Sequence, residues 1–158
     1  MSSYVTVEEA NVYIRNNLLS TDPLRVSWEV LSEQDRQVLL NRSAAAINAL
    51  PYPGRKTVSG QENAFPRYPY TEVPEDVKAA QIENALTFSD ESQSEDGKLY
   101  QRMWAYGISS YRIGNLSETV GSASGNAGLS SELVRGGIIS IVAQSLLIPY
   151  LRGGYCVE

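Results

Sequence analysis

A chain of 158 residues, 42% of them hydrophobic, is long enough for one hydrophobic core but short for two, so we expect one globular domain. Histidine is absent, which excludes Ser-His and Cys-His catalytic pairs and histidine metal sites. The formal net charge of -5 argues against a general nucleic-acid binder, because such proteins neutralise phosphates with Lys and Arg.

Both ends of the chain suggest an intracellular protein. Residues 1–9 lack the basic region and the apolar core of a signal peptide. Cys156 is the single cysteine and cannot form an internal disulfide. The longest apolar run, 138–151, is interrupted by polar residues and is too short to span a bilayer of about 30 Å. We therefore expect a protein that is made and kept in a cytoplasm, without a membrane anchor.

The first predicted helix begins with a capping box. The hydroxyl of Thr6 can accept from an amide three residues on, and Glu9 can reach back to the cap. The following apolar residues recur at helical spacing, which predicts one buried face that ends near 19–23; they are Ala10, Tyr13, Ile14 and Leu18.

A second start signal of the same kind runs from Ser32 to Asp35 and opens a helix that continues to Leu50. Pro51 ends this helix because it cannot donate the next backbone hydrogen bond. Between the two helices stands Trp28, which we expect in the core, since large aromatic side chains dominate core burial.

The central segment, 55–67, has neither a helical nor a strand period and is expected to be a structured loop. Arg55, Lys56 and Arg67 bracket it together with Phe65 and Tyr68. These residues could form a small nucleic-acid patch of cations and stacking faces. Alternatively, salt bridges pin the loop around a buried Phe65, and this is the interpretation that we favour.

The next predicted helix covers 73–86. Pro74 suits its first position, and Glu75 and Asp76 complement the positive end of its dipole. A polar stretch follows at 89–97, and the period of the aromatic-rich segment 98–111 is ambiguous.

The last third of the chain divides into three predicted pieces. Apolar residues on either side of Gly114-Asn115 predict a hairpin at 111–120, which would need a surface to pack on. Residues 121–137 are expected to be a Gly/Ser-rich tether. The apolar segment 138–158 must then bury itself either on its own domain or on a neighbour.

These observations predict a mainly α protein: a small helical bundle with a short β-hairpin and an extended, flexible C-terminal segment. Residues 1–120 would form the body, 121–137 the tether and 138–158 a docking segment. No residue pattern indicates a catalytic, cofactor-binding or metal site, because the acidic pairs Glu8-Glu9 and Glu75-Asp76 are explained by helix first turns. We expect no enzyme and no cofactor.

Several segments, in their order and spacing, resemble the small head-tail connector (adaptor) proteins of tailed bacteriophages. They are Tyr4–Ala10, Trp28, Ala49–Lys56, Ala64–Arg67, Val73–Gln81 and Ser145–Leu151. Some sequences of that group carry the description "putative DnaT-like single-stranded-DNA-binding protein". The Gly/Ser stretch 121–128 is a departure from the group.

The resemblance implies a structural virion protein at the head-tail junction, assembled in the host cytoplasm. Its subunits would form a ring, of twelve, beneath the portal protein and join the DNA-filled capsid to the tail. Its partners would be its own copies, the portal and a tail terminator or other tail-completion protein. DNA would pass through the lumen without specific binding, and no membrane would be involved.

The connector hypothesis places the candidate docking residues in two segments. In the central segment they are Arg55, Lys56, Phe65 and Arg67. In the C-terminal segment they are the apolar residues Ile138, Ile141, Leu146, Leu147, Tyr150 and Leu151. The alternative is a single-stranded-DNA-binding module, which would use Arg55, Lys56, Arg67, Tyr68 and Tyr70. An enzyme, the third possibility, has only unpaired carboxylates and Cys156 to offer.

Overall fold

The computed structural model describes residues 2–90, 99, 110–113, 116–119, 132–134 and 136–151. This part of the chain is mainly helical, as expected. Its named elements are α1 (Val7–Asn17), α2 (Pro23–Glu29), α3 (Glu33–Asn48), α4 (Glu75–Ser89), β1 (Ser110–Ile113), β2 (Leu116–Thr119) and α7 (Ile141–Leu151). None of the described helices is both long enough and apolar enough to cross a membrane.

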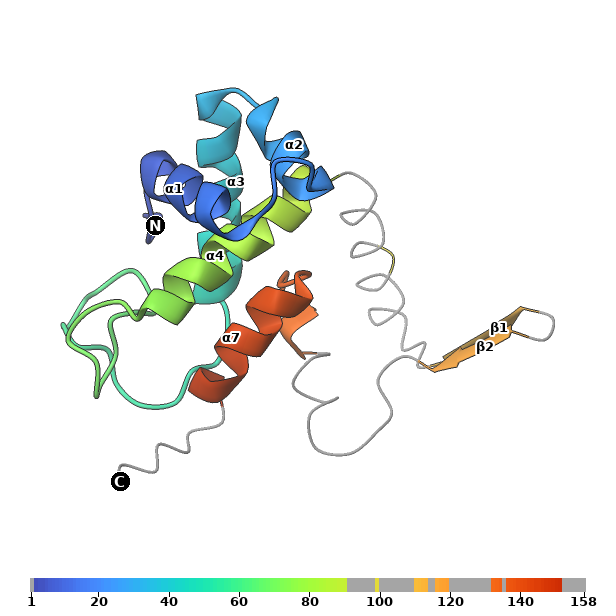
Figure 1. Ribbon diagram of the computed structural model, residues 1–158. Helices are drawn as coiled ribbons and strands as arrows, with labels where there is room; N and C mark the ends of the chain where they lie inside the picture. The colour runs from blue at the N-terminus through green and yellow to red at the C-terminus, as the bar shows by residue number, and fades with distance from the viewer. Residues whose placement is uncertain are drawn as a thin grey trace.

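Helix α4 lies at the centre of the helical body, with α1, α2 and α3 on one side and α7 on the other (Figure 1). It is therefore buried on several faces rather than along one stripe, and even its polar Gln81 and Asn84 are fully buried. The helix begins at Glu75 rather than at the predicted 73, because Pro74 is its cap, and it continues to Ser89 rather than ending at 86.

The predicted start signals of α1 and α3 are confirmed. The amide of Glu9 donates to Thr6 Oγ1 at 3.2 Å, and Glu9 Oε2 accepts from the Thr6 amide at 2.7 Å, which completes the capping box. Ser32 accepts from the amide of Asp35 at 3.1 Å. Both helices thus begin where these short-range bonds satisfy amides that have no partner within the helix.

Helix α2 was not predicted. The sequence interpretation used 19–23 only as the end of the first helix, whereas Asp22 caps a new one: its side chain accepts from the amide of Leu24 at 2.9 Å, and Pro23 takes the first helical position. Trp28 lies on this helix and is 1% exposed, so its predicted core position is confirmed. Its indole Nε1 donates to Asn11 Oδ1 at 2.9 Å.

The buried apolar side chains form two clusters on either side of α4. One joins α1, α2, α3 and α4 around Ile14, Trp28 and Leu86. The other joins α3, the loop after it, α4 and α7 around Phe65 and Leu147. The two clusters share α3 and α4, which makes these helices the frame on which both ends of the described chain pack.

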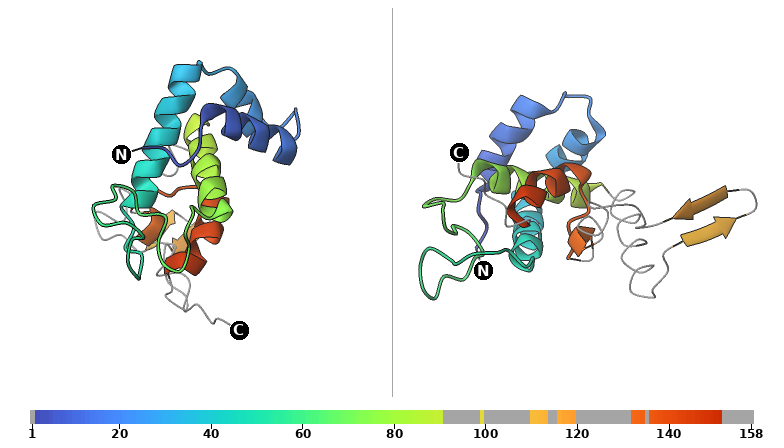
Figure 2. Two further views of the ribbon diagram at one scale, coloured as in Figure 1. Left: turned by 90° about the vertical axis from the view of Figure 1, so that its left-hand side faces the viewer. Right: turned by 90° about the horizontal axis from the view of Figure 1, so that it is seen from below.

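The prediction of an extended, flexible C-terminal segment is wrong for residues 141–151. These residues form α7, which packs along α4 (Figures 1 and 2). The amide of Asn84 holds the entry to this helix: its Oδ1 accepts from Ile139 N (2.9 Å) and Ser140 N (3.3 Å), and its Nδ2 donates to Gly137 O (3.2 Å). The apolar segment is therefore buried on its own domain.

Strands β1 and β2 lie where the sequence places a hairpin, at 111–120. They pair antiparallel, with Ser110 opposite Thr119 and Ile113 opposite Leu116. The expected turn, 114–115, lies outside the described residues. So do most of the expected tether, namely 121–131 and 135, and the end of the chain, 152–158.

Candidate functional site

The loop between α3 and α4, residues 51–74 and here called the central loop, extends beyond the ends of both helices (Figures 1 and 2). Its two arms are joined by an antiparallel bridge between Lys56 and Arg67. The Tyr68 amide donates to Arg55 O at 3.0 Å, and the Thr57 amide donates to Pro66 O at 3.2 Å. The loop is irregular, as predicted, but it has a defined shape.

Two of its predicted docking cations are used to hold that shape. Arg67 donates to four backbone carbonyl oxygens, those of Tyr52 (2.9 Å), Pro53 (3.2 Å), Gly54 (2.6 Å) and Ala64 (3.3 Å). A guanidinium suits this task because it presents five donors in a fixed plane.

Lys56 binds the opposite arm in the same manner. Its ammonium donates to the carbonyl oxygens of Gln61 (2.8 Å) and Glu62 (3.1 Å). Within the described part of the chain, Lys56 and Arg67 thus hold the loop through backbone carbonyls rather than through the salt bridges that the sequence interpretation expected. The reason is geometric: the loop turns its own carbonyl groups towards these two cations.

Phe65 anchors the central loop in the core, and its predicted burial is confirmed. It is 2% exposed, and its ring meets three tyrosine rings edge-on. The centroids of Tyr52, Tyr150 and Tyr4 lie 4.8, 5.6 and 6.4 Å away. Edge-to-face pairs at such distances stabilise beyond the area that they bury. Phe65 therefore positions the loop and is not available to a partner.

The outer end of the central loop presents the residues that remain accessible. This surface, here called the loop tip, comprises Arg55, Lys56, Val58, Tyr68 and Tyr70, which border a hollow of about 710 Å³. Tyr68 is 67% exposed and Val58 61% exposed. The guanidinium of Arg55 lies 5.9 Å from the centre of the Tyr68 ring. Cations beside aromatic faces can bind either a protein partner or unstacked bases.

The predicted docking residues of the C-terminal segment do not form one surface. Ile138, Leu147 and Tyr150 are buried in the chain's own core. Leu146 and Leu151 are partly buried against the same cluster. Only Ile141, at 78% exposed, lies at the surface among these six. The structure therefore separates the loop tip, which can meet a partner, from α7, which supports the body.

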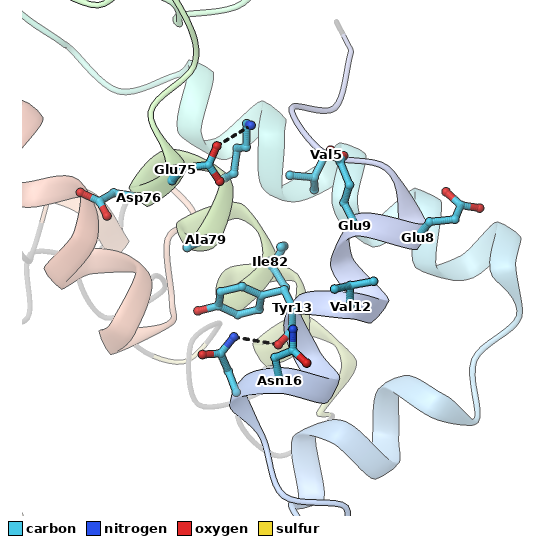
Figure 3. Close-up of a pocket in the computed structure, with 12 residues that line it drawn as sticks. Val5, Glu8, Glu9, Val12, Tyr13, Asn16, Glu75, Asp76, Ala79 and Ile82 are labelled. Carbon is cyan, nitrogen blue, oxygen red and sulfur yellow. Dashed lines mark hydrogen bonds and ion pairs between the residues drawn. The ribbon is translucent and has the colours of Figure 1, made fainter.

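A groove between α1 and α4, of about 570 Å³, was missed by sequence reasoning (Figure 3). Its apolar lining includes Val12, Tyr13 and Ile82, and its rim carries four carboxylates with a single lysine: Glu8, Glu9, Glu75, Asp76 and Lys78. The sequence analysis assigned each acidic pair to the first turn of a helix, and both assignments are correct. No local signal could show that the two helix starts lie side by side.

One half-buried carboxylate joins the same two helices. The Tyr13 hydroxyl on α1 donates to Glu83 Oε1 on α4 at 3.0 Å. Burial raises the pKa of Glu83 above its usual value, although the hydrogen bond from Tyr13 acts in the opposite direction. Burial and the neighbouring Glu83 raise the pKa of Tyr13 to about 12. The pair therefore couples the α1–α4 contact to pH.

The described residues contain no group of three or more His, Cys, Asp or Glu side chains placed to hold a metal ion. Cys156 lies outside the part of the chain that the structure describes.

Comparison with known protein families adds one match. A family model described as "Putative DnaT-like ssDNA binding protein" matches residues 1–143, which is most of the chain. No curated protein and no solved structure matches.

Proposed function

We propose that this chain, which belongs to the family described as "Putative DnaT-like ssDNA binding protein", is a structural subunit of the head-tail junction of a tailed bacteriophage. In this role twelve copies form a ring beneath the portal protein, and the ring connects the DNA-filled capsid to the tail. It acts by binding proteins, and DNA passes through the ring without specific contacts.

The observation that carries the proposal is the construction of the central loop. Arg67 and Lys56 donate hydrogen bonds to the loop's own carbonyl groups, and Phe65 anchors the loop in the core. A loop held in this way presents Arg55, Val58 and Tyr68 at little cost in conformational entropy on binding. Tyrosine and arginine are enriched among the residues that dominate protein-protein interfaces.

The charge balance also favours protein over nucleic acid as the partner. The net charge of -5 gives the chain little attraction for a phosphate backbone. An acidic wall around a channel would repel phosphate and let DNA slide. This part of the proposal requires acidic side chains to line the ring lumen, and a lumen dominated by Lys and Arg in a ring structure would contradict it.

The test is the mass of the complex that the full chain forms with a purified portal ring, measured by light scattering. The wild-type chain should bind the portal. A loop-tip variant, Arg55→Glu/Tyr68→Ala, should lose most of this binding, whereas Arg15→Glu/Val30→Ala, which has the same change in charge at other exposed positions, should retain it. A wild-type chain that ignores the portal ring would overturn the proposal.

Single-stranded-DNA binding is the second candidate, because the family description names it and the Arg55–Tyr68 pair offers a cation beside an exposed ring. Fluorescence anisotropy with a labelled oligothymidine measures it directly. Binding at physiological salt that weakens steeply as salt rises, and that Tyr68→Ala abolishes, would support this candidate. The connector proposal expects no such binding.

A further inference from the structure

We propose that the loop tip of one copy docks into the α1–α4 groove of a second copy. The inference rests on the proposed function and deepens it, because it names the two surfaces through which neighbouring subunits meet. The charge and shape of these two surfaces, both of which belong to the described residues, are complementary.

The groove has an apolar interior that remains open to solvent. Val12 is 49% exposed although it lies beside the nearly buried Ile82, and the Tyr13 ring forms part of the same lining (Figure 3). Burial of exposed apolar area of this kind would favour association. The groove is thus a surface that gains from being covered.

The rim of the groove selects a basic occupant. Glu8 and Glu9 come from the first turn of α1, and Glu75 and Asp76 from the first turn of α4, so both edges carry negative charge. The lysine of the rim, Lys78, donates to Glu75 at 2.7 Å. Asp76 is turned towards α7, where its carboxylate accepts from the Tyr150 hydroxyl at 3.2 Å (Figure 3). A cation brought to the groove therefore meets chiefly the negative charge of Glu8 and Glu9.

The loop tip has the complementary chemistry. None of the ten residues that line its hollow is acidic, and they include both Arg55 and Lys56. Beside these cations stand Val58 and Tyr68, two of the most exposed large hydrophobic side chains of the described chain. The tip can therefore place an apolar group against Val12 while its cations approach the carboxylate rim.

Each copy would carry one tip and one groove, and this has a consequence for assembly. If each subunit gives its tip to one neighbour and its groove to another, the contacts run head to tail and can close into a ring. If two copies exchange tips reciprocally, the product is a closed dimer. The proposed function requires the head-to-tail ring, whereas the tip-groove contact is the same in the ring and in the dimer.

The experiment measures the self-association of the full chain, without portal, by sedimentation velocity over a range of protein and salt concentrations. The wild type should associate, and association should weaken as salt rises. Reversal of the tip charge at Arg55, which does not hold the loop (Arg55→Glu), or of the rim charges (Glu8→Lys/Glu75→Lys) should weaken association by roughly tenfold or more, as expected for close charge pairs at an interface.

The decisive sample is the equimolar mixture of the tip-reversed and the rim-reversed variants. Each variant alone should be impaired, but the mixture should associate, since a reversed tip then meets a reversed rim. Reversal at two carboxylates away from the groove, Glu29→Lys/Glu33→Lys, is the matched control and should leave association unchanged. Circular dichroism confirms that each variant is folded.

The proposal is overturned if the wild type stays monomeric at all concentrations, or if the charge reversals act no more strongly than the control. These failures can be distinguished from failure of the proposed function. A monomeric chain that still assembles on a portal ring would reject the tip-groove contact and keep the connector role. A chain that self-associates as described but ignores the portal would support the contact and reject that role.

Discussion

The guanidinium of Arg67 donates to the backbone carbonyl of Tyr52 at 2.9 Å, across 15 positions of the chain. The same side chain also binds the carbonyl oxygens of Pro53 and Gly54, so three consecutive carbonyl groups turn towards one cation. The path of the central loop therefore depends on a side chain from its opposite arm. The loop tip, which carries both proposals, is supported by this cluster of hydrogen bonds.

Replacement of Arg67 by lysine should destabilise the protein by about 2 kcal/mol, because a point-like ammonium cannot serve carbonyl groups that a planar guanidinium reaches together. Urea unfolding measures the loss. Arg55→Lys, at the exposed end of the same loop, is the control and should change the free energy of unfolding by less than about 0.5 kcal/mol. Equal stability of the two variants would contradict the structural role of Arg67.

Asn84→Ala should cost about 3 kcal/mol. The substitution leaves the amides of Ile139 and Ser140 and the carbonyl of Gly137 without their buried partner. Hydrogen exchange should show faster exchange in α7, since this asparagine holds its entry. Asn16→Ala, at an exposed position of α1, should have little effect on either measurement. Normal protection of α7 in the Asn84 variant would disprove the argument.

Two substitutions on α7 test whether this helix belongs to the core. Leu147 is fully buried, so Leu147→Ala should lower the free energy of unfolding by about 2–5 kcal/mol. Ile141 is 78% exposed on the same helix, and Ile141→Ala should cost less than about 0.5 kcal/mol. Thermal or urea unfolding of both variants decides the matter. If Leu147→Ala changed the free energy of unfolding only slightly, α7 would be a docking segment that can leave the core rather than part of the core.

The raised pKa of Glu83 predicts how stability varies with pH. The folded state holds this proton more tightly than the unfolded state, so Glu83 contributes an unfavourable term once the pH exceeds its folded pKa. The term vanishes as the pH falls through that pKa towards 4.5, the ordinary value for glutamate. Glu83→Gln, which keeps an acceptor for Tyr13, should therefore be more stable than wild type at pH 7.

The measurement is unfolding by urea at pH 5 and pH 7 for Glu83→Gln, wild type and the exposed control Glu33→Gln. The advantage of Glu83→Gln should be larger at pH 7 than at pH 5. An advantage that is the same at both pH values would mean that Glu83 ionises as easily in the folded chain as in the unfolded one.

Features that depend on neighbours within one helical turn could be predicted from the sequence. The capping box of Thr6 and Glu9, the cap at Ser32 and the stop at Pro51 each involve contacts over a few residues. The burial of Phe65 and Trp28 followed from their large apolar area alone. The start of α2 was as local as these, and the Asp22-Pro23 pair was the signal that could have revealed it.

What the sequence by itself determined, then, is a mainly helical chain with a structured loop between two of its helices, because capping, proline stops and apolar periodicity act locally. Only the tertiary structure decided that 138–151 packs on its own domain and that Arg67 binds carbonyl groups. The same holds for Glu8 and Glu75, which meet at one groove. Each of these outcomes depends on segments distant in the sequence, and α4, which packs against α1, α2, α3 and α7, brings most of these segments together.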